Sequence, residues 1–345
     1  MSTSHDTTTA ARRALVELVF GSMSAQVVGT FVKLGVADAL DGTERSAEEV
    51  ATACQAPADT VRRLLRAASA LGLAADQGAD RFALTPTGAM LRSTGQGSLS
   101  TFARVFTDPV MVTAWHRLDE AVRTGRTTFE HAFGAEFFDH LDTEPELAAS
   151  FNTAMSQGTQ VVASVLPGAY DFGRFEAVVD VGGGDGTLLA AILSRHEGLH
   201  GVLFDTAGGL AQAGDVLDAA GVASRCAIRT GDFFDSVPGE AEVLVLKSVL
   251  HDWDDQRATT ILRNCREVLP EHGRLLVVEP VLPDVVRDDA SPVVYLSDLN
   301  MLVNLGGLER TQAEFDALLG GSGFAVADVI PLPPSGFSLV EAVPV

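Results

Sequence analysis

The sequence is poor in several residue types, and each shortage excludes a class of protein. Three cysteines at wide spacing fit neither a disulfide framework nor a cysteine-bound metal, and they suit a reducing cytoplasm. Only 24 basic residues accompany 46 acidic ones, so the net charge of −22 disfavours nucleic acid and favours a small-molecule partner. Glu17, Lys33 and Asp38 interrupt the apolar segment near the amino terminus well before the roughly 20 residues that a membrane span needs.

The residues that are present predict a globular protein of two domains. The 345 residues are 46% apolar and 20% charged, and a domain typically takes roughly 150 residues. Apolar residues at three- and four-residue spacing predict helices to about residue 165, and short β-prone runs follow. The first ten residues lack this periodicity and are expected to form a tail. We expect a mainly α domain at 1–100, a helical linker at 101–168 and a second domain at 169–345.

The amino-terminal segment has the pattern of a winged helix. Ser46 and Glu49 have the spacing of a helix-capping box. Asp59 is placed to cap a second helix, and Gly72 is placed to end it. The β-prone residues at 73–84 then predict a hairpin. Two helices followed by a hairpin form a winged-helix module.

A winged helix serves either DNA binding or packing against a second copy. DNA binding would use Arg62, Arg63 and Arg66 on the second helix. However, residues 1–100 contain 10 acidic and 9 basic residues, so the segment is nearly neutral where a DNA-binding domain is basic. We therefore favour dimerisation, and a cofactor-sensing DNA-binding regulator is the least favoured alternative.

Seven short β-prone runs follow, mostly separated by helical segments. This alternation predicts an α/β fold with a doubly wound sheet and helices on both faces. In such a sheet the ligand lies beyond the carboxyl ends of the strands, where the strand order switches. The residues that follow each run are therefore candidates for a functional site. The runs are 177–181, 201–204, 227–229, 243–246, 275–278, 325–330 and 338–342.

The first run leads into a glycine-rich turn, Asp-Val-Gly-Gly-Gly-Asp-Gly-Thr at 180–187. The backbone of such a turn can approach a nucleoside closely. An NAD fingerprint requires Gly or Ala where this chain has Thr187, and Asp180 disfavours a pyrophosphate at the turn. S-adenosylmethionine is a cation without phosphate and fits better. We expect Asp180, Gly182 and Gly184 to contact it.

Acidic and aromatic residues after the next two runs extend this nucleoside site. Asp205 lies 23 residues after Gly182 and is placed to accept hydrogen bonds from ribose hydroxyls. Asp232 and Phe233 follow the third run, where they can bind adenine at its amino edge and its face. A solvated strand end and ordinary core packing are the plain alternatives for these residues. For Asp205 the spacing from the glycine turn favours the ribose role, whereas Asp232 and Phe233 alone are a weak signal, because aromatic residues are usually core.

The fourth run ends at Lys247, and His251 follows it. Lys247 is one of two lysines in the chain, so we do not interpret it as ordinary surface charge. His251 lies just beyond a strand that ends at the ligand cleft, and histidine suits proton transfer near neutral pH. Asp252, Asp254 and Asp255 could indicate a metal, but acids at the start of a helix more simply cap it. We expect no metal.

Taken together, these motifs resemble the small-molecule O-methyltransferases, a family that includes plant phenylpropanoid and flavonoid enzymes, hydroxyindole enzymes and bacterial polyketide-tailoring enzymes. The likeness covers nearly the whole chain. It rests on five motifs in order, at 180–184, 231–234, 247–253, 278–280 and 306–311. The resemblance implies a Rossmann-like class I methyltransferase domain, preceded by a winged-helix dimerisation domain. It also implies transfer of the methyl group of S-adenosylmethionine to a hydroxyl of a small aromatic or polyketide-type metabolite, as in antibiotic biosynthesis.

The resemblance also assigns roles within the catalytic group. It implies that His251 is the general base, with Glu279 and Glu309 flanking the ring, orienting it and stabilising its charged form. A positioned imidazole can remove the proton of a phenol, whose pKa is about 10. The same matching places cofactor contacts at Asp205, Asp232, Phe233 and Lys247.

Further residues are expected at the acceptor. The resemblance places Phe151, Met155 and Asn304 at the border of cofactor and acceptor, although helix-core packing is the plain alternative for Phe151. Asp252, Asn300 and Met301 are expected on the acceptor side. Asn300 stands where many plant members carry a substrate-clamping Met, which indicates an acceptor other than a plant phenylpropanoid. Relatives that use the cofactor for hydroxylation, decarboxylation or pericyclic reactions are the alternative, and His251 argues against those that have lost the histidine.

Overall fold

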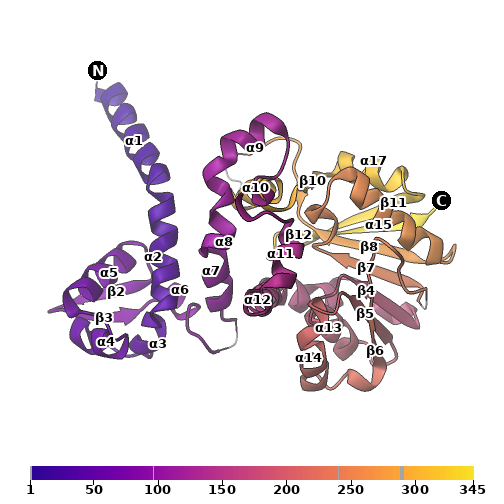
Figure 1. Cartoon of the computed structure of the whole chain (residues 1–345), viewed down its shortest axis with the longest axis horizontal. Coiled ribbons are helices and arrows are strands. Elements are labelled where there is room, and N and C mark those ends of the chain that lie inside the picture. The colour runs from indigo at the N-terminus through magenta and orange to yellow at the C-terminus, as the bar shows by residue number, and fades with distance from the viewer. Residues whose placement is uncertain (1, 96, 240, 288–290) are drawn as a thin grey trace. The chain divides into compact units, whose positions relative to one another are not determined.

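The computed structural model describes residues 2–95, 97–239, 241–287 and 291–345 (Figure 1). The chain divides into two compact units, Met1–Val112 and Thr113–Val345. No single helix in the described part is both long and apolar enough to cross a membrane. Only the pair Thr8–Val19 and Gly21–Lys33, which is bent by 46°, reaches that length and composition when its two halves are taken together.

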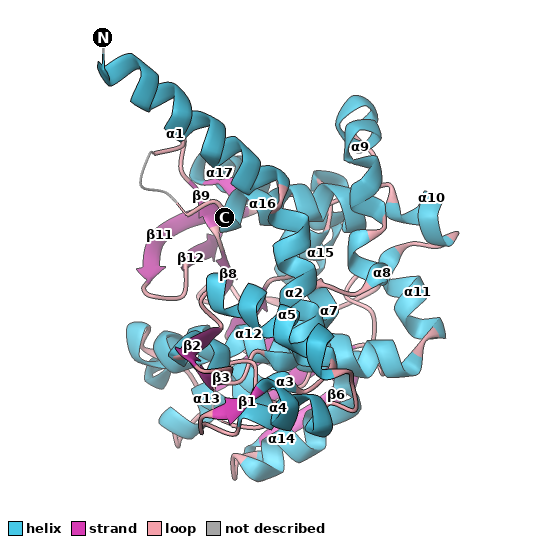
Figure 2. Ribbon diagram, turned by 90° about the vertical axis from the view of Figure 1, so that its left-hand side faces the viewer, coloured by secondary structure: helices cyan, strands magenta, loops and turns pink. Residues whose placement is uncertain are grey.

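The amino-terminal unit is mainly helical and carries a small antiparallel sheet of order β1-β3-β2 (Figures 1 and 2). Phe31, Leu40, Leu65 and Phe82 are buried in its core. Its elements are α1 (Ser2–Val19), α2 (Gly21–Lys33), α3 (Val36–Leu40), β1 (Arg45–Ser46), α4 (Ala47–Ala53), α5 (Ala58–Ala70), β2 (Ala74–Gly78), β3 (Arg81–Leu84), α6 (Pro86–Ala89), α7 (Ser100–Phe106) and α8 (Pro109–Val112).

The structure confirms most of the local predictions for this unit. Ser46 and Glu49 form the capping box, and β2 and β3 form the hairpin. Asp59 as a helix cap was wrong, because Pro57 is the N-cap of α5 and Asp59 lies in the first turn, where it pairs with Arg62.

The predicted amino-terminal tail was also wrong, because α1 begins at Ser2. Ser and Thr lower helix propensity only slightly, so a helix started by the following Ala- and Arg-rich residues can extend through them.

The carboxyl-terminal unit begins with helices that precede its sheet. They are η1 (Ala114–Arg117), α9 (Leu118–Thr124), α10 (Phe129–Phe133), α11 (Phe137–Thr143), α12 (Pro145–Ala169) and η2 (Phe172–Arg174). Later helices are α13 (Thr187–Arg195), η3 (Gly209–Gln212), α14 (Ala213–Ala219), η4 (Ala223–Arg225), η5 (Leu250–Asp252), α15 (Asp255–Val268), α16 (Val293–Asn300), the π-helix η6 (Met301–Leu305) and α17 (Gln312–Gly320).

All seven predicted runs are strands of one sheet. The strands are β4 (Ala177–Val181), β5 (His200–Asp205), β6 (Cys226–Thr230), β7 (Val243–Lys247), β8 (Arg274–Glu279), β11 (Phe324–Leu332) and β12 (Phe337–Pro344). Their order is β11-β12-β8-β7-β4-β5-β6, which can be followed in Figure 1. The pairs from β8 to β6 are parallel, and β12 is antiparallel to both of its neighbours. The prediction of an α/β doubly wound sheet is confirmed.

Side-chain alternation along the strands gives the sheet two apolar faces. Val179 and Leu244 pack with α15 and α17 on one face. Val178 and Val243 pack with α12, α13 and α14 on the other. Strands that are buried on both sides require this near-continuous apolar sequence.

The topology fixes where a ligand can lie. In the sheet, β5 is the neighbour of β4 on one edge and β7 is its neighbour on the other edge. The strand order therefore switches direction between β4 and β7. A separate two-stranded parallel ladder joins β9 (Val281–Leu282) to β10 (Arg310–Thr311). Because β9 directly follows Glu279-Pro280 and β10 directly follows Glu309, this ladder brings the two glutamates toward one place.

Candidate active site

The glycine turn after β4 leaves its backbone open at the switch point. Gly182 and Gly184 have φ of +70° and +58°, a conformation that L side chains rarely adopt. A Cβ at Gly182 would lie 2.8 Å from Val249, and one at Gly183 would lie 2.5 Å from Leu203. The turn is therefore held tightly against its neighbours at Gly182 and Gly183, whereas nothing lies within 4 Å of a Cβ at Gly184, where only the backbone conformation favours glycine.

Two carboxylates lie at this turn. Asp205, at the end of β5, accepts hydrogen bonds from the backbone N–H of Gly184 at 2.8 Å and of Thr206 at 2.6 Å. Asp180 is buried, and its Oδ2 has no hydrogen-bond partner among the described residues. Burial and the nearby Asp205 carboxylate raise the pKa of Asp180 to about 7. The turn therefore has two carboxylates beside it, and the charged form of Asp180 is disfavoured in the absence of a further cation.

Asp232 and Phe233 follow β6, as the sequence predicted. Phe233 approaches the turn, because a Cβ at Gly182 would lie 3.5 Å from its ring. Asp232 is exposed, and its carboxylate accepts a hydrogen bond from the Phe234 N–H at 2.8 Å. Asn264 on α15 donates to the carbonyls of Phe233 and Phe234 and so holds this loop. The role of Asn264 has no signal in the sequence, because nothing in its spacing relates it to residues 231–234.

Lys247 ends β7 among the same acidic groups. Its Nζ donates to the Thr159 hydroxyl on α12 at 2.9 Å. Burial lowers its pKa to about 8, against the attraction of the Asp180, Asp252 and Glu279 carboxylates. Lys247 therefore connects the glycine turn, α12 and the segment that carries His251.

His251 lies in η5, on a turn held by a buried carboxylate. Glu279 Oε1 accepts hydrogen bonds from the backbone N–H groups of Val249, Leu250 and His251, at 3.1, 2.7 and 3.2 Å. Val249 thus contacts the glycine turn with its side chain and Glu279 with its backbone. The hydrogen bonds described for Glu279 reach the backbone of the turn and not the imidazole ring.

The imidazole ring has a carboxylate on each side. Nδ1 lies 3.1 Å from Glu309 Oε1, and Nε2 lies 3.5 Å from Asp252 Oδ1. Burial disfavours the imidazolium, but the surrounding carboxylates outweigh it and raise the pKa of His251 to about 9. Burial raises the pKa of Asp252 to about 7, although the imidazolium opposes this shift. The environment thus stabilises a proton on His251.

The remaining predicted residues lie on α12 and around η6. Asn300 Oδ1 accepts hydrogen bonds from Asn304 Nδ2 at 2.8 Å and from Trp115 Nε1 at 3.1 Å. Met301 is buried beside them at the start of the π-helix, a feature frequent at functional sites. The sequence had not indicated Trp115, which lies 185 residues away along the chain.

Phe151 and Met155 are half-buried and lie one turn apart on α12. Phe151 packs edge-on against Phe137 and Phe138, and Phe138 contacts Trp253. Trp253 also contacts Phe233. This aromatic chain connects α12 to the loop that follows β6. The ring contacts of Phe151 are with other aromatic side chains on α11.

Two residues beside the His251 turn had no assigned role in the sequence analysis. Ser297 on α16 donates a hydrogen bond to Glu309 Oε1 at 2.8 Å, so it fixes the oxygen that faces His251. Arg310 is buried and donates to the backbone of the His251 turn. Arg310 lies within a motif quoted above, but the motif alone did not reveal the direction of its side chain.

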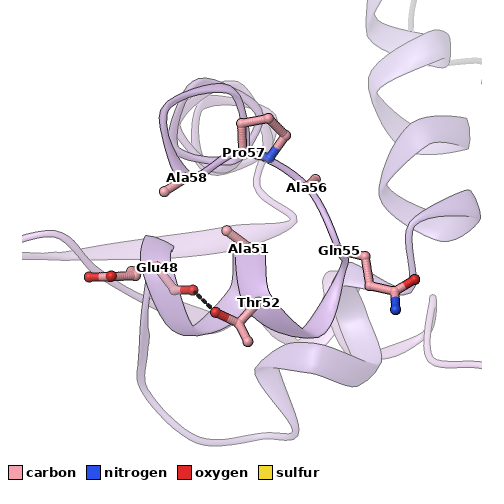
Figure 3. A pocket seen from close by; sticks show the side chains of 7 residues that line it. All are labelled: Glu48, Ala51, Thr52, Gln55, Ala56, Pro57 and Ala58. Carbon is pink, nitrogen blue, oxygen red and sulfur yellow. Dashed lines mark hydrogen bonds between the residues drawn. The ribbon is translucent and has the colours of Figure 1, made fainter.

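A hollow on the amino-terminal unit contains none of the predicted site residues. Figure 3 shows its lining, where the Thr52 hydroxyl donates to the Glu48 carbonyl. No group of three or more His, Cys, Asp or Glu side chains in the described residues is arranged to hold a metal ion.

The residues at the switch point fit S-adenosylmethionine. The glycine turn offers bare backbone, which a flat nucleoside can approach closely. The unpartnered Asp180 oxygen and the Asp205 carboxylate favour a cation and can accept hydrogen bonds from ribose hydroxyls. A pyrophosphate would meet these same carboxylates and be repelled.

Comparisons with known proteins show the family of the chain. Residues 115–325 match the O-methyltransferase domain, and residues 16–94 match the O-methyltransferase dimerisation domain. The chain is 44% identical to the O-demethylpuromycin-O-methyltransferase of Streptomyces alboniger, over 97% of this chain and 90% of that protein.

Solved structures show the same relationship over the whole chain. A mitomycin 7-O-methyltransferase superposes with a TM-score of 0.91 at 34% identity, over 99% of this chain and 100% of that one. An O-methyltransferase from neocarzinostatin biosynthesis was solved with S-adenosylmethionine and 2-hydroxy-5-methyl naphthoic acid. It has a TM-score of 0.78 at 34% identity, over 93% of this chain and 96% of that one. The dimerisation domain supports a homodimer. The chain belongs to the O-methyltransferase family and is an S-adenosylmethionine-dependent O-methyltransferase.

Proposed function

We propose that the enzyme methylates a hydroxyl of a small aromatic or polyketide-type secondary metabolite, with His251 as the general base. The observation that carries the proposal is the imidazole held between Glu309 at Nδ1 and Asp252 near Nε2. A ring fixed at one nitrogen presents the other in a defined direction, which is the arrangement that a positioned base needs.

The carboxylates supply the driving force for proton transfer. A phenol with a pKa of about 10 gives up its proton at neutral pH only to a group that holds the proton well. The surrounding carboxylates raise the pKa of His251 to about 9, which brings base and acceptor close to a match, and the minor neutral form of the ring at pH 7 is the form that accepts the proton. Nε2 takes the hydroxyl proton, and Glu309 stabilises the imidazolium through Nδ1. Buried Glu279 keeps the turn in place through three backbone N–H groups.

Other residues bind the two small molecules. S-adenosylmethionine, when bound, supplies a methyl group already activated by its sulfonium. Asp205 accepts hydrogen bonds from the ribose, Gly182 and Gly184 leave the backbone open, and Asp180 and Lys247 set the charge around the turn. Asp232 and Phe233 hold the adenine at its edge and face. Proximity of the acceptor hydroxyl to the methyl group then contributes much of the rate.

The acceptor site is built around α12 and η6. Phe151 and Met155 border it from α12, while Asn304, Asn300 and Met301 border it from the other side with Asp252. An aromatic acceptor is supported by the relative solved with a hydroxy naphthoic acid and by the phenylalanine-rich packing near α12. Within the π-helix, the Asn304 amide donates a hydrogen bond to the Asn300 side-chain oxygen. This hydrogen bond fixes the Asn304 amide at the acceptor site.

Methylation of a panel of hydroxylated aromatics tests this function. The protein is incubated with methyl-labelled S-adenosylmethionine and phenols, naphthols or hydroxynaphthoic acids, and the products are analysed by mass spectrometry. We expect an acceptor heavier by one methyl group, with the label on oxygen and release of S-adenosylhomocysteine. An acceptor that gains oxygen, loses carbon dioxide or rearranges without label would contradict methyl transfer and favour the non-methylating alternative.

A further inference from the structure

Arg310 is a buried arginine on the carbonyl side of the His251 turn. Its side chain has no exposed surface. Nη1 donates to the Leu250 carbonyl and Nη2 to the Trp253 carbonyl, both at 3.0 Å. These two carbonyls lie on either side of His251 in the chain, so one planar guanidinium holds both ends of the turn.

The N–H side of the same turn is held by the opposite charge. Glu279 Oε1 accepts the backbone N–H groups of residues 249–251. The Glu279 carboxylate on the backbone N–H groups and the Arg310 guanidinium on the backbone carbonyls together fix the turn from both sides. Charge-assisted hydrogen bonds are about twice as strong as neutral ones.

The turn needs such support because its backbone is crowded and strained. Ser248 has φ of +53°, a left-handed conformation that costs a residue other than glycine free energy. The Leu308 N–H donates to the His251 carbonyl at 2.9 Å, and a Cβ at Gly307 would lie only 2.0 Å from that oxygen. Segment 306–311 is therefore pressed directly against the residue that carries the imidazole.

The small β9·β10 ladder links the segments that carry Glu279 and Arg310. Arg310 in β10 pairs with Val281 in β9. Val281 lies two residues after Glu279, and Arg310 directly follows Glu309. Asp255, at the first turn of α15, accepts from Arg310 Nε and Nη2 at 3.1 and 2.9 Å and fixes the outer end of the guanidinium.

We propose that Arg310 is a positioning residue for proton transfer, which sets the place of His251 by holding the carbonyls of Leu250 and Trp253. The proposal rests on the proposed function of His251 as the base. Arg310 touches neither the cofactor nor the acceptor in this scheme. It acts on the rate only through the backbone that carries the imidazole.

Arg310→Lys and Arg310→Met separate this role from simple stabilisation. Lysine keeps the charge and cannot reach both carbonyls, and methionine keeps the volume without charge. We expect kcat to fall about ten- to hundredfold in both, the effect of a misplacement of about 1 Å, with KM for the acceptor changed less than threefold. Cofactor affinity, measured by calorimetry with S-adenosylmethionine, stays near that of the unaltered enzyme.

Arg225→Lys is the matched control. Arg225 likewise holds three backbone carbonyls, those of Leu193, His196 and Leu199, on elements that carry none of the catalytic cluster. Its replacement is expected to lower Tm and leave kcat per cofactor-binding site unchanged. If Arg310→Lys likewise lowers only Tm and leaves kcat per binding site intact, Arg310 is merely structural and the proposal is overturned.

Asp255→Asn supplies a second variant if the Arg310 variants do not fold. The Asp255 side chain is 73% exposed, and its replacement loosens only the outer contact of the guanidinium. We expect kcat to fall two- to tenfold, with Tm little changed. If the Arg310 variants do not fold and Asp255→Asn has an unchanged kcat, the proposal is contradicted.

A background of His251→Asn distinguishes failure of this proposal from failure of the proposed function. If Arg310 acts through His251, adding Arg310→Lys or Asp255→Asn to His251→Asn lowers kcat no further. An equal further fall shows that Arg310 acts by another route and overturns the proposal. If His251→Asn alone keeps the full rate, the base assignment has failed, and the proposal that depends on it is overturned with it.

Discussion

Glu309 is the residue whose contact with the imidazole ring is most direct. Its Oε1 accepts a hydrogen bond from the Ser297 hydroxyl and lies within hydrogen-bond distance of His251 Nδ1. Glu309→Gln keeps the shape and removes the charge, so kcat is expected to fall about tenfold, less than on loss of the base itself. Kinetics of the single and double variants with His251→Asn measure this, since residues acting as one unit are not additive. Fully additive losses would show that Glu309 acts apart from the ring.

The raised pKa of His251 sets the sign of the pH dependence. A base must be neutral to accept a proton, and the carboxylates raise the pKa of His251 to about 9. The active fraction therefore grows as pH rises, and kcat/KM increases about tenfold per pH unit below that pKa. A profile from pH 6.5 to 9.5 with an acceptor of high pKa checks this. A profile that is already flat above pH 7 would contradict the assigned environment.

Asp205 makes a separate prediction about the cofactor. Asp205→Ala removes the carboxylate that we propose accepts hydrogen bonds from the ribose, and it also frees the Gly184 N–H. S-adenosylmethionine binding is expected to weaken by about 1–3 kcal/mol. Calorimetry measures this, with the exposed Asp218→Ala on α14 as a control that keeps full affinity. Equal affinity in Asp205→Ala would remove this residue from the cofactor site.

At the scale of elements, segment 306–311 must pack closely against η5. A Cβ on Gly307 would lie 2.0 Å from the His251 carbonyl oxygen, so Gly307→Ala is expected to destabilise the fold by about 1–3 kcal/mol and to lower kcat. Gly320→Ala on α17 is the control, because nothing lies within 4 Å of its added methyl group. Urea unfolding compares the two variants. Equal stability of the two variants would show that segment 306–311 can shift to accommodate the methyl group and would contradict close packing.

Much of the element order was predictable from the sequence. The central strands β4, β7 and β8 are short apolar runs, because strands covered by helices on both faces leave little room for polar residues. The edge strands β6 and β11 are more exposed. The candidate site residues could be proposed because parallel strands place their carboxyl ends at one edge of the sheet. Asp180 and Asp205 lie near the ends of β4 and β5, and Lys247 and His251 lie at and after the end of β7.

The contacts between distant segments were not predictable. Neither Trp115 donating to Asn300 nor Arg310 reaching the Leu250 carbonyl leaves a periodic or spacing signal. The same holds for Glu279, whose buried oxygen meets the backbone of the turn. Such contacts depend on side-chain direction after the fold has formed, and local pattern carries no information about it.

At the scale of the whole molecule, the amino-terminal unit leaves apolar surface uncovered. The exposed large apolar residues of α1, of the junction with α2 and of the start of α2 are Leu15, Val16, Leu18, Val19, Phe20 and Met23. Contiguous exposed apolar surface of this kind marks an interaction site, and the match to a dimerisation domain indicates a second copy as the partner.

Light scattering tests this expectation. The full chain is predicted to have twice the mass of one 36.2 kDa chain. Removal of residues 1–95 is predicted to give a monomer or an aggregating product, because the surface that holds the copies together is lost. A stable monomer of the full chain would contradict dimerisation.

Base catalysis by His251 is tested most directly by the single-turnover rate of methyl transfer at pH 7 in His251→Asn, with saturating S-adenosylmethionine and an acceptor of high pKa. The exposed His272→Asn serves as the control. The base assignment predicts a rate about a hundred- to ten-thousandfold lower than that of the unaltered enzyme, with cofactor affinity retained and partial recovery at high pH, where the acceptor ionises unaided. Near-full methylation by His251→Asn at pH 7 would contradict it and leave proximity as the source of the rate.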